Sequence, residues 1–83
     1  MRDPERITEL LELINALWSK SPDLRFNQLI YNLQYGYSQK NSNLGLIKVE
    51  DSDGFTRTGF DFFNLEDEAF ITYLKEVLSH GKY

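Results

Sequence analysis

The chain has 83 residues, a net charge of -4 and no cysteine, and 41% of its residues are hydrophobic. We expect one domain over residues 1–83, whose core is built without disulfides or thiolate metal ligands. The acidic balance disfavours nucleic-acid binding, no apolar run is long enough to span a membrane, and the N-terminus lacks the apolar centre of a signal peptide, so we expect a cytoplasmic protein.

The first predicted element is an amphipathic helix over about residues 4–20. Asp3 is a favourable N-cap residue, and Pro4 suits the first helical position because no amide hydrogen bond is needed there. Pro22 disfavours helix at the preceding residue and ends the segment. Apolar residues recur at spacings of three and four and define one face that we expect to be buried: Ile7, Leu10, Leu11, Ile14, Leu17 and Trp18.

A second, shorter helix is predicted over about residues 26–35. Gly36 is a stop signal for it, because glycine readily adopts the left-handed conformation that ends helices. A helix this short is not stable alone, so it must pack on the first. Its inner face would carry Phe26, Leu29, Ile30, Leu33 and Tyr37.

Residues 37–60 are predicted to form a loop or a short β-hairpin between the second and third helices. Residues 38–45 are polar and rich in turn formers, which indicates a mobile loop. Residues 46–50 and 55–58 have strand character and flank a segment ending in Asp53-Gly54, a turn signal. An isolated hairpin is only marginally stable, so this hairpin must pack against the helices or be loosely ordered.

The third helix is predicted over about residues 65–79. Asn64 is a good N-cap residue with Asp67 as its capping-box partner, and Gly81 is the expected C-cap. The apolar face would carry Leu65, Ala69, Phe70, Tyr73, Leu74, Val77 and Leu78. The predicted fold class is therefore mostly α, with three helices around one core and a loop or hairpin insertion between helices 2 and 3.

No catalytic or metal-binding set is evident in the sequence. A calcium loop beginning at Asp51 fails at its fifth, sixth and twelfth positions, so this segment indicates a turn. The acidic residues 66–68 point about 100° apart on a helix and cannot converge on one ion, whereas they suit its N-terminus. His80 is the single histidine and has no predicted partner. We expect no enzyme, no cofactor, no metal site and no small-molecule substrate.

One candidate binding surface lies on the second helix. Gln28 and Asn32 share a face one turn apart, with Arg25 just before them, and Tyr31 and Tyr35 form an adjacent pair. Tyrosine and arginine are frequent anchors of protein interfaces. The alternative is that Gln28 and Asn32 hydrogen-bond to the backbone of the connector and loop and that the tyrosines close the core.

A second candidate surface is the segment rich in phenylalanine before the third helix, which carries Phe55, Phe60, Phe62 and Phe63. At least one of these rings should pack on the helices, but four exceed what so small a core can hide. An exposed remainder would mark a surface for a protein partner or a homodimer. The alternative is a satellite core beneath the loop.

Three sequence blocks resemble a family of small uncharacterised bacterial and bacteriophage proteins. They are residues 3–18 (Asp-Pro-Glu-Arg-Ile to Trp), residues 22–32 (Pro-Asp-Leu-Arg-Phe-Asn-Gln-Leu-Ile-Tyr-Asn) and residues 61–68 (Asp-Phe-Phe-Asn-Leu-Glu-Asp-Glu). Members of that family are shorter between the second and third blocks, so residues 37–60 resemble an insertion. The resemblance implies a helical fold and a phage or prophage setting. It carries no established activity and no catalytic residues.

We therefore predict a protein–protein interaction module without catalytic activity. The alternative is a nucleic-acid-associated regulator of winged helix-turn-helix type, since two helices, a hairpin and a helix loosely resemble that architecture. Against it, the second helix offers no outward basic side chain beyond Arg25. A third class, an acidic mimic of nucleic acid, is disfavoured because a net charge of -4 is modest for that role.

Overall fold

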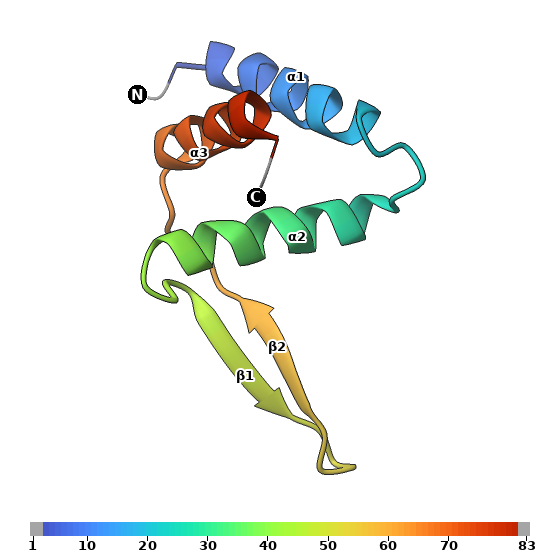
Figure 1. The fold of residues 1–83 in the computed structure, drawn as a ribbon. Coiled ribbons are helices and arrows are strands. Elements are labelled where there is room, and N and C mark those ends of the chain that lie inside the picture. Colours follow the sequence, from blue (N-terminus) through green and yellow to red (C-terminus); the bar gives the residue numbers. More distant parts are fainter. Residues whose placement is uncertain (1–2, 82–83) are drawn as a thin grey trace.

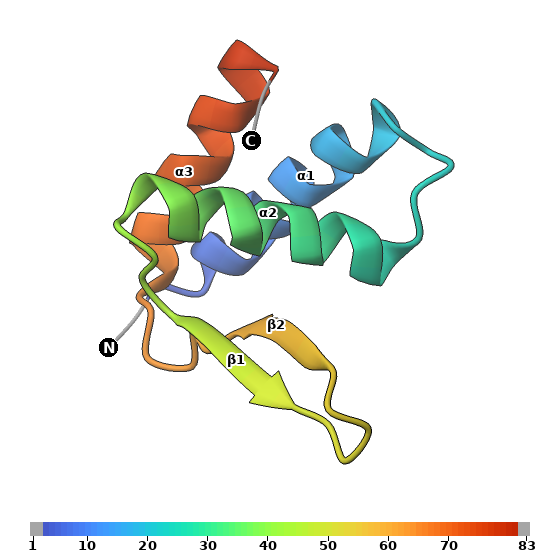
Figure 2. The same ribbon diagram turned by 60° about the horizontal axis from the view of Figure 1, so that its bottom comes forward.

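The computed structural model describes residues 3–81 and contains three helices and one hairpin (Figure 1). In chain order the elements are α1 (Glu5–Ser19), α2 (Phe26–Lys40), β1 (Leu46–Glu50), β2 (Thr56–Phe60) and α3 (Asp67–His80). α1 and α3 lie side by side, α2 crosses them, and the hairpin extends away from the helices in both ribbon views (Figures 1 and 2). The predicted fold class, mostly α with a hairpin between the second and third helices, is confirmed.

One apolar core joins the three helices. Its buried members are Leu17, Leu29, Leu33, Tyr37, Tyr73, Leu74 and Val77. Trp18 packs at the margin of this core, and its Nε1–H donates to the carbonyl of Leu24 at 2.8 Å, which fastens the connector to α1. The expectation that Trp18 belongs to the core is therefore confirmed.

The predicted buried face of α1 is wrong at two positions, Ile7 and Leu11. Ile7 and Leu11 have 51% and 62% of their surface exposed, although their spacing matches that of Ile14 and Trp18. The apolar stripe is wider than the surface that α2 and α3 cover, so Ile7 and Leu11 stay exposed while Leu10 between them packs against the core. The helix also begins at Glu5 and ends at Ser19, one residue inside each predicted bound, while the Asp3 side chain accepts a hydrogen bond from the Glu5 amide at 2.9 Å.

The predicted end of the second helix is also wrong, because α2 continues five residues beyond Tyr35 to Lys40. Gly36 lies inside the helix, where glycine costs about 1 kcal/mol relative to alanine. Burial of Tyr37 in the core offsets that cost. Residues 38–40 are accordingly helical rather than part of a mobile loop, and the helix gives way at Asn41 to a turn.

Ser38 is fully buried, and its hydroxyl has no hydrogen-bond partner within residues 3–81. A buried, unsatisfied hydroxyl is destabilising, and alanine is also the better helix former. We therefore expect Ser38→Ala to raise the free energy of unfolding by about 1 kcal/mol, measured by urea denaturation. A loss of stability in this variant would show that the hydroxyl does find a partner.

α3 begins two residues later than predicted, at Asp67, and ends one residue later, at His80. Glu66 occupies the N-cap position instead of Asn64, because the chain first makes a turn in which the Leu65 amide donates to the Phe62 carbonyl at 3.0 Å. The predicted C-cap is confirmed, since Gly81 is left-handed with a φ of 70°. On the helix itself Ala69 is exposed and not part of the buried face, whereas Ile71 is buried.

β1 and β2 pair in antiparallel register from Leu46 opposite Phe60 to Glu50 opposite Thr56. The turn between them is closed by two backbone bonds, from the Asp51 amide to the Phe55 carbonyl at 2.7 Å and from the Gly54 amide to the Asp51 carbonyl at 3.0 Å. The Asp51 carboxylate pairs with Arg57 at 2.7 Å. The interpretation of residues 51–54 as a turn is therefore confirmed.

Candidate interaction surface

The two predicted binding surfaces meet at the base of the hairpin. Tyr31 and Tyr35 stack on each other on the outer face of α2, with ring centroids 6.3 Å apart. Phe60, the last residue of β2, packs on both, at 5.6 Å from the Tyr31 ring and 6.2 Å from the Tyr35 ring. We call these three residues the root cluster. They join the hairpin to α2.

The root cluster continues into the core through a chain of ring contacts. Phe60 stacks on Phe62 at 6.0 Å, Phe62 meets the edge of Tyr37 at 5.5 Å, and Tyr37 meets Tyr73 at 5.3 Å. Edge-to-face and offset contacts of this kind stabilise beyond the area they bury. Two of the four phenylalanines, Phe60 and Phe62, are therefore structural, as expected for part of the segment.

We expect Phe60→Ala to loosen the hairpin without unfolding the helices, because Phe60 contacts both tyrosines and Phe62. Hydrogen exchange should become at least about tenfold faster at the amides of β1 and β2 while α3 stays protected. The matched control is Phe55→Ala, since Phe55 is exposed and has no ring contact in the described chain. Equal effects of the two substitutions would contradict an anchoring role for the root cluster.

Arg25 and Gln28 have a local role at the start of α2. The Gln28 side chain accepts a hydrogen bond from the Arg25 amide at 2.9 Å, which satisfies a donor at the N-cap. Asn32 is partly buried, and its side chain makes no hydrogen bond within residues 3–81. Of the predicted helix surface, the structure therefore joins only Tyr31 and Tyr35 to the hairpin.

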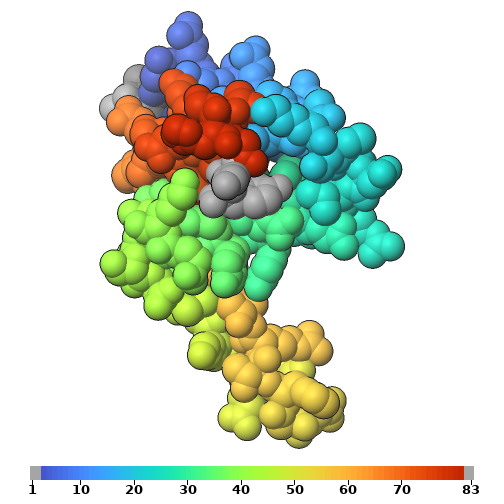
Figure 3. Space-filling model, viewed as in Figure 1, coloured from blue at the N-terminus to red at the C-terminus, as the bar shows by residue number. Residues whose placement is uncertain are grey.

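An apolar surface lies on the hairpin, and of its residues only Phe55 was among the predicted interface residues. Ile47, Val49 and Phe55 are exposed by 44%, 53% and 69%, and the register places them on one face. Phe60, which contacts α2, lies on the other face. We call the first face the hairpin outer face; it also carries the ion pair between Asp51 and Arg57. Figure 3 shows the hairpin as an arm that projects below the helices.

The sequence did contain a signal for this face. Ile47 and Val49 alternate with Lys48 and Glu50, and a turn centred on residue 53 places Phe55 in line with them. The remaining phenylalanine, Phe63, is 91% exposed beside the start of α3. The exposed remainder that the composition predicted therefore consists of Phe55 and Phe63.

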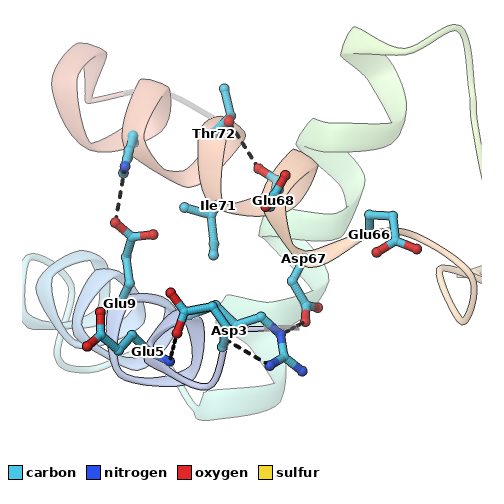
Figure 4. Close-up of a pocket in the computed structure, with 10 residues that line it drawn as sticks. Asp3, Glu5, Glu9, Glu66, Asp67, Glu68, Ile71 and Thr72 are labelled. Carbon is cyan, nitrogen blue, oxygen red and sulfur yellow. Dashed lines mark hydrogen bonds and ion pairs between the residues drawn. The ribbon is translucent and has the colours of Figure 1, made fainter. Parts of the chain in front are cut away.

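A hollow with a volume of about 850 Å³ lies between the N-terminal ends of α1 and α3 (Figure 4). Its rim is acidic, and two of the carboxylates form ion pairs with cations of the rim. Arg6 Nε binds Asp67 at 2.7 Å, and Lys75 Nζ binds Glu9 at 3.2 Å. Residues 3–81 contain no group of three side chains arranged to hold a metal ion. The acidic residues 66–68 occupy the N-cap and first turn of α3, where the helix dipole favours negative charge.

No family model, curated protein or solved structure matches this chain. The resemblance to small bacterial and bacteriophage proteins therefore stays a prediction. Within residues 3–81, no helix combines the length and apolar character needed to cross a membrane.

Proposed function

We propose that the protein is a non-catalytic interaction module that binds another protein chain through its hairpin. The observation that carries this proposal is the outward direction of Ile47, Val49 and Phe55, on the side of the hairpin that faces away from α2. A two-stranded hairpin is marginal in water unless its apolar face packs against something. Here the root cluster holds the base of the hairpin, while the outer face is left for a partner.

The charges of the hairpin favour a protein over a nucleic acid. Lys48 and Arg57 are its only cations, Arg57 is paired with Asp51, and Glu50 and Asp53 add negative charge. A winged helix-turn-helix regulator would need unpaired cations on its wing to neutralise phosphates. We further propose a phage or prophage setting, on the strength of the three resembling sequence blocks alone, and a cytoplasmic location, which the cysteine-free composition supports.

Site-specific photo-crosslinking in the host cell tests this function. A benzoylphenylalanine at position 55 should give protein adducts, whereas the same probe at position 12, exposed on α1, should give few. The adduct yield at position 55 should exceed the yield at position 12 by about fivefold or more, since exposed apolar side chains at a contact lie within reach of the partner. Equal, low yields at both positions would contradict the proposal. Mass spectrometry separates adducts with this chain from adducts with a different protein.

A further inference from the structure

We propose that the partner of the hairpin is a second copy of this chain, bound edge to edge. β1 of one copy pairs with β1 of the other in antiparallel orientation, and the two hairpins become one four-stranded sheet in the order β2–β1–β1–β2. This inference rests on the proposed function in taking the hairpin as the binding element, and it places the contact with the second copy on the edge of β1 rather than on the hairpin outer face. Three observations support it: the open edge of β1, the charges along that edge, and the position of the arm.

The backbone of β1 has hydrogen-bonding groups that point away from β2. The bonds from the Asp51 amide to Phe55 and from the Asp61 amide to Gly45 show that odd-numbered residues of β1 face β2. The amides and carbonyls of Lys48 and Glu50 therefore point to the outer edge. Leu46 belongs to the same set, but its amide already donates to the Asn43 carbonyl at 3.1 Å.

β1 is the more accessible edge of the hairpin. The main contacts between α2 and the hairpin fall on β2, with Phe60 against the two tyrosines of the root cluster. A strand added beside β2 would approach α2. A strand added beside β1 meets open space along the arm that Figures 1 and 3 show.

The charges on β1 select one register. With the two-fold axis at Val49, Lys48 of each copy lies opposite Glu50 of the other, which gives two pairs of opposite charge across the new edge. An axis at Lys48 or at Glu50 would place like charges opposite each other, and an axis at Ile47 would leave Lys48 opposite Leu46. Only the register at Val49 is self-complementary, as a two-fold interface requires.

This register also fits the backbone and the apolar side chains. Lys48 and Glu50 have outward-pointing backbone groups, so each of their cross-copy pairs is a hydrogen-bonded pair. The two Val49 residues form the closer, non-bonded pair between them, and each covers part of the other's exposed surface. Four strands meet the requirement for a stable sheet that two strands do not. The antiparallel arrangement places the two helical bodies at opposite ends of the sheet.

Charge swaps on the full chain test the register. Analytical ultracentrifugation of the wild type over micromolar to millimolar concentration should show a monomer–dimer equilibrium. Lys48→Glu alone and Glu50→Lys alone place like charges across the edge and should each weaken dimerisation about tenfold or more. The double variant Lys48→Glu/Glu50→Lys should restore it. Mixing the two single variants should give a heterodimer, because one then carries two acidic and the other two basic residues at these positions.

Glu12→Lys is the control for total charge, since it changes the net charge as Glu50→Lys does but lies on α1. It should leave dimerisation unchanged, and circular dichroism should show all variants folded. A wild type that stays monomeric at millimolar concentration would overturn the inference. So would a dimer that tolerates both single swaps but is lost in Phe55→Ser, since that result assigns the contact to the hairpin outer face.

The failure of this inference and the failure of the proposed function give different results. If crosslinking at position 55 yields adducts with a different protein and the pure chain stays monomeric, the function stands and the second copy is excluded. If neither adducts nor dimers form, both proposals fail.

Discussion

Leu74→Ala is expected to lower the free energy of unfolding by about 2–5 kcal/mol, since it removes a fully buried side chain and leaves a cavity. Leu74 lies in the core cluster that includes Leu29 and Leu33 of α2. A domain of 83 residues has a free energy of unfolding of roughly 4–12 kcal/mol, so this single substitution removes a large part of it. Urea denaturation followed by circular dichroism measures the difference, and thermal denaturation should show a clearly lower Tm.

Leu11→Ala is the matched control, because it removes the same atoms from a helix position that is 62% exposed. Its cost should stay below about 1 kcal/mol, since most of that side chain is already in water. The spacing of apolar residues alone would assign Leu11 and Leu74 equal burial. A loss of several kcal/mol in Leu11→Ala would therefore favour the sequence prediction over the structure and would indicate that α1 is covered on this face.

The sequence predicts the elements of this fold better than their ends. Helical periodicity and turn residues identify three helices and a hairpin in the observed order. The helix ends depend on packing, which a local pattern does not contain. Gly36 is a stop signal by propensity, yet α2 continues beyond it because Tyr37 is buried in the core. Asn64 is a good N-cap by residue type, yet residues 62–65 form a turn, so α3 begins only at Asp67.

The candidate surface was predictable only in part, for a related reason. Residue type placed Tyr31, Tyr35 and Phe60 among the candidates, but it did not show that they contact one another and serve to hold the hairpin. Gln28 was predicted to belong to the binding surface because of its helical spacing, whereas in the structure its side chain bonds to the Arg25 amide. The direction of Ile47 and Val49 depends on which face of the hairpin meets α2, and that is a tertiary property.

Gly45→Ala is expected to be the most disruptive single substitution at the base of the hairpin. Gly45 has a φ of +75°, where a side chain is strained. An added Cβ would overlap the Phe62 ring and lie 2.9 Å from the Asp61 carbonyl, closer than real contacts allow. Strain and overpacking together should cost about 2–4 kcal/mol. Hydrogen exchange should accelerate most in β1 and β2, since the Gly45 carbonyl accepts the bond from the Asp61 amide at 2.8 Å.

Gly54→Ala separates the cost of backbone strain from the cost of overpacking. Gly54 has a similar φ of +82° but has no atom within 4 Å of the added Cβ, so only backbone strain of about 1–2 kcal/mol applies. The excess loss in Gly45→Ala over Gly54→Ala then measures how tightly the hairpin base is packed against Phe62. Equal losses would mean that Phe62 can move aside and that the arm is loosely held. A large excess would mean that the arm is held by a rigid base, so that its open edge and outer face are presented to a partner in a fixed direction.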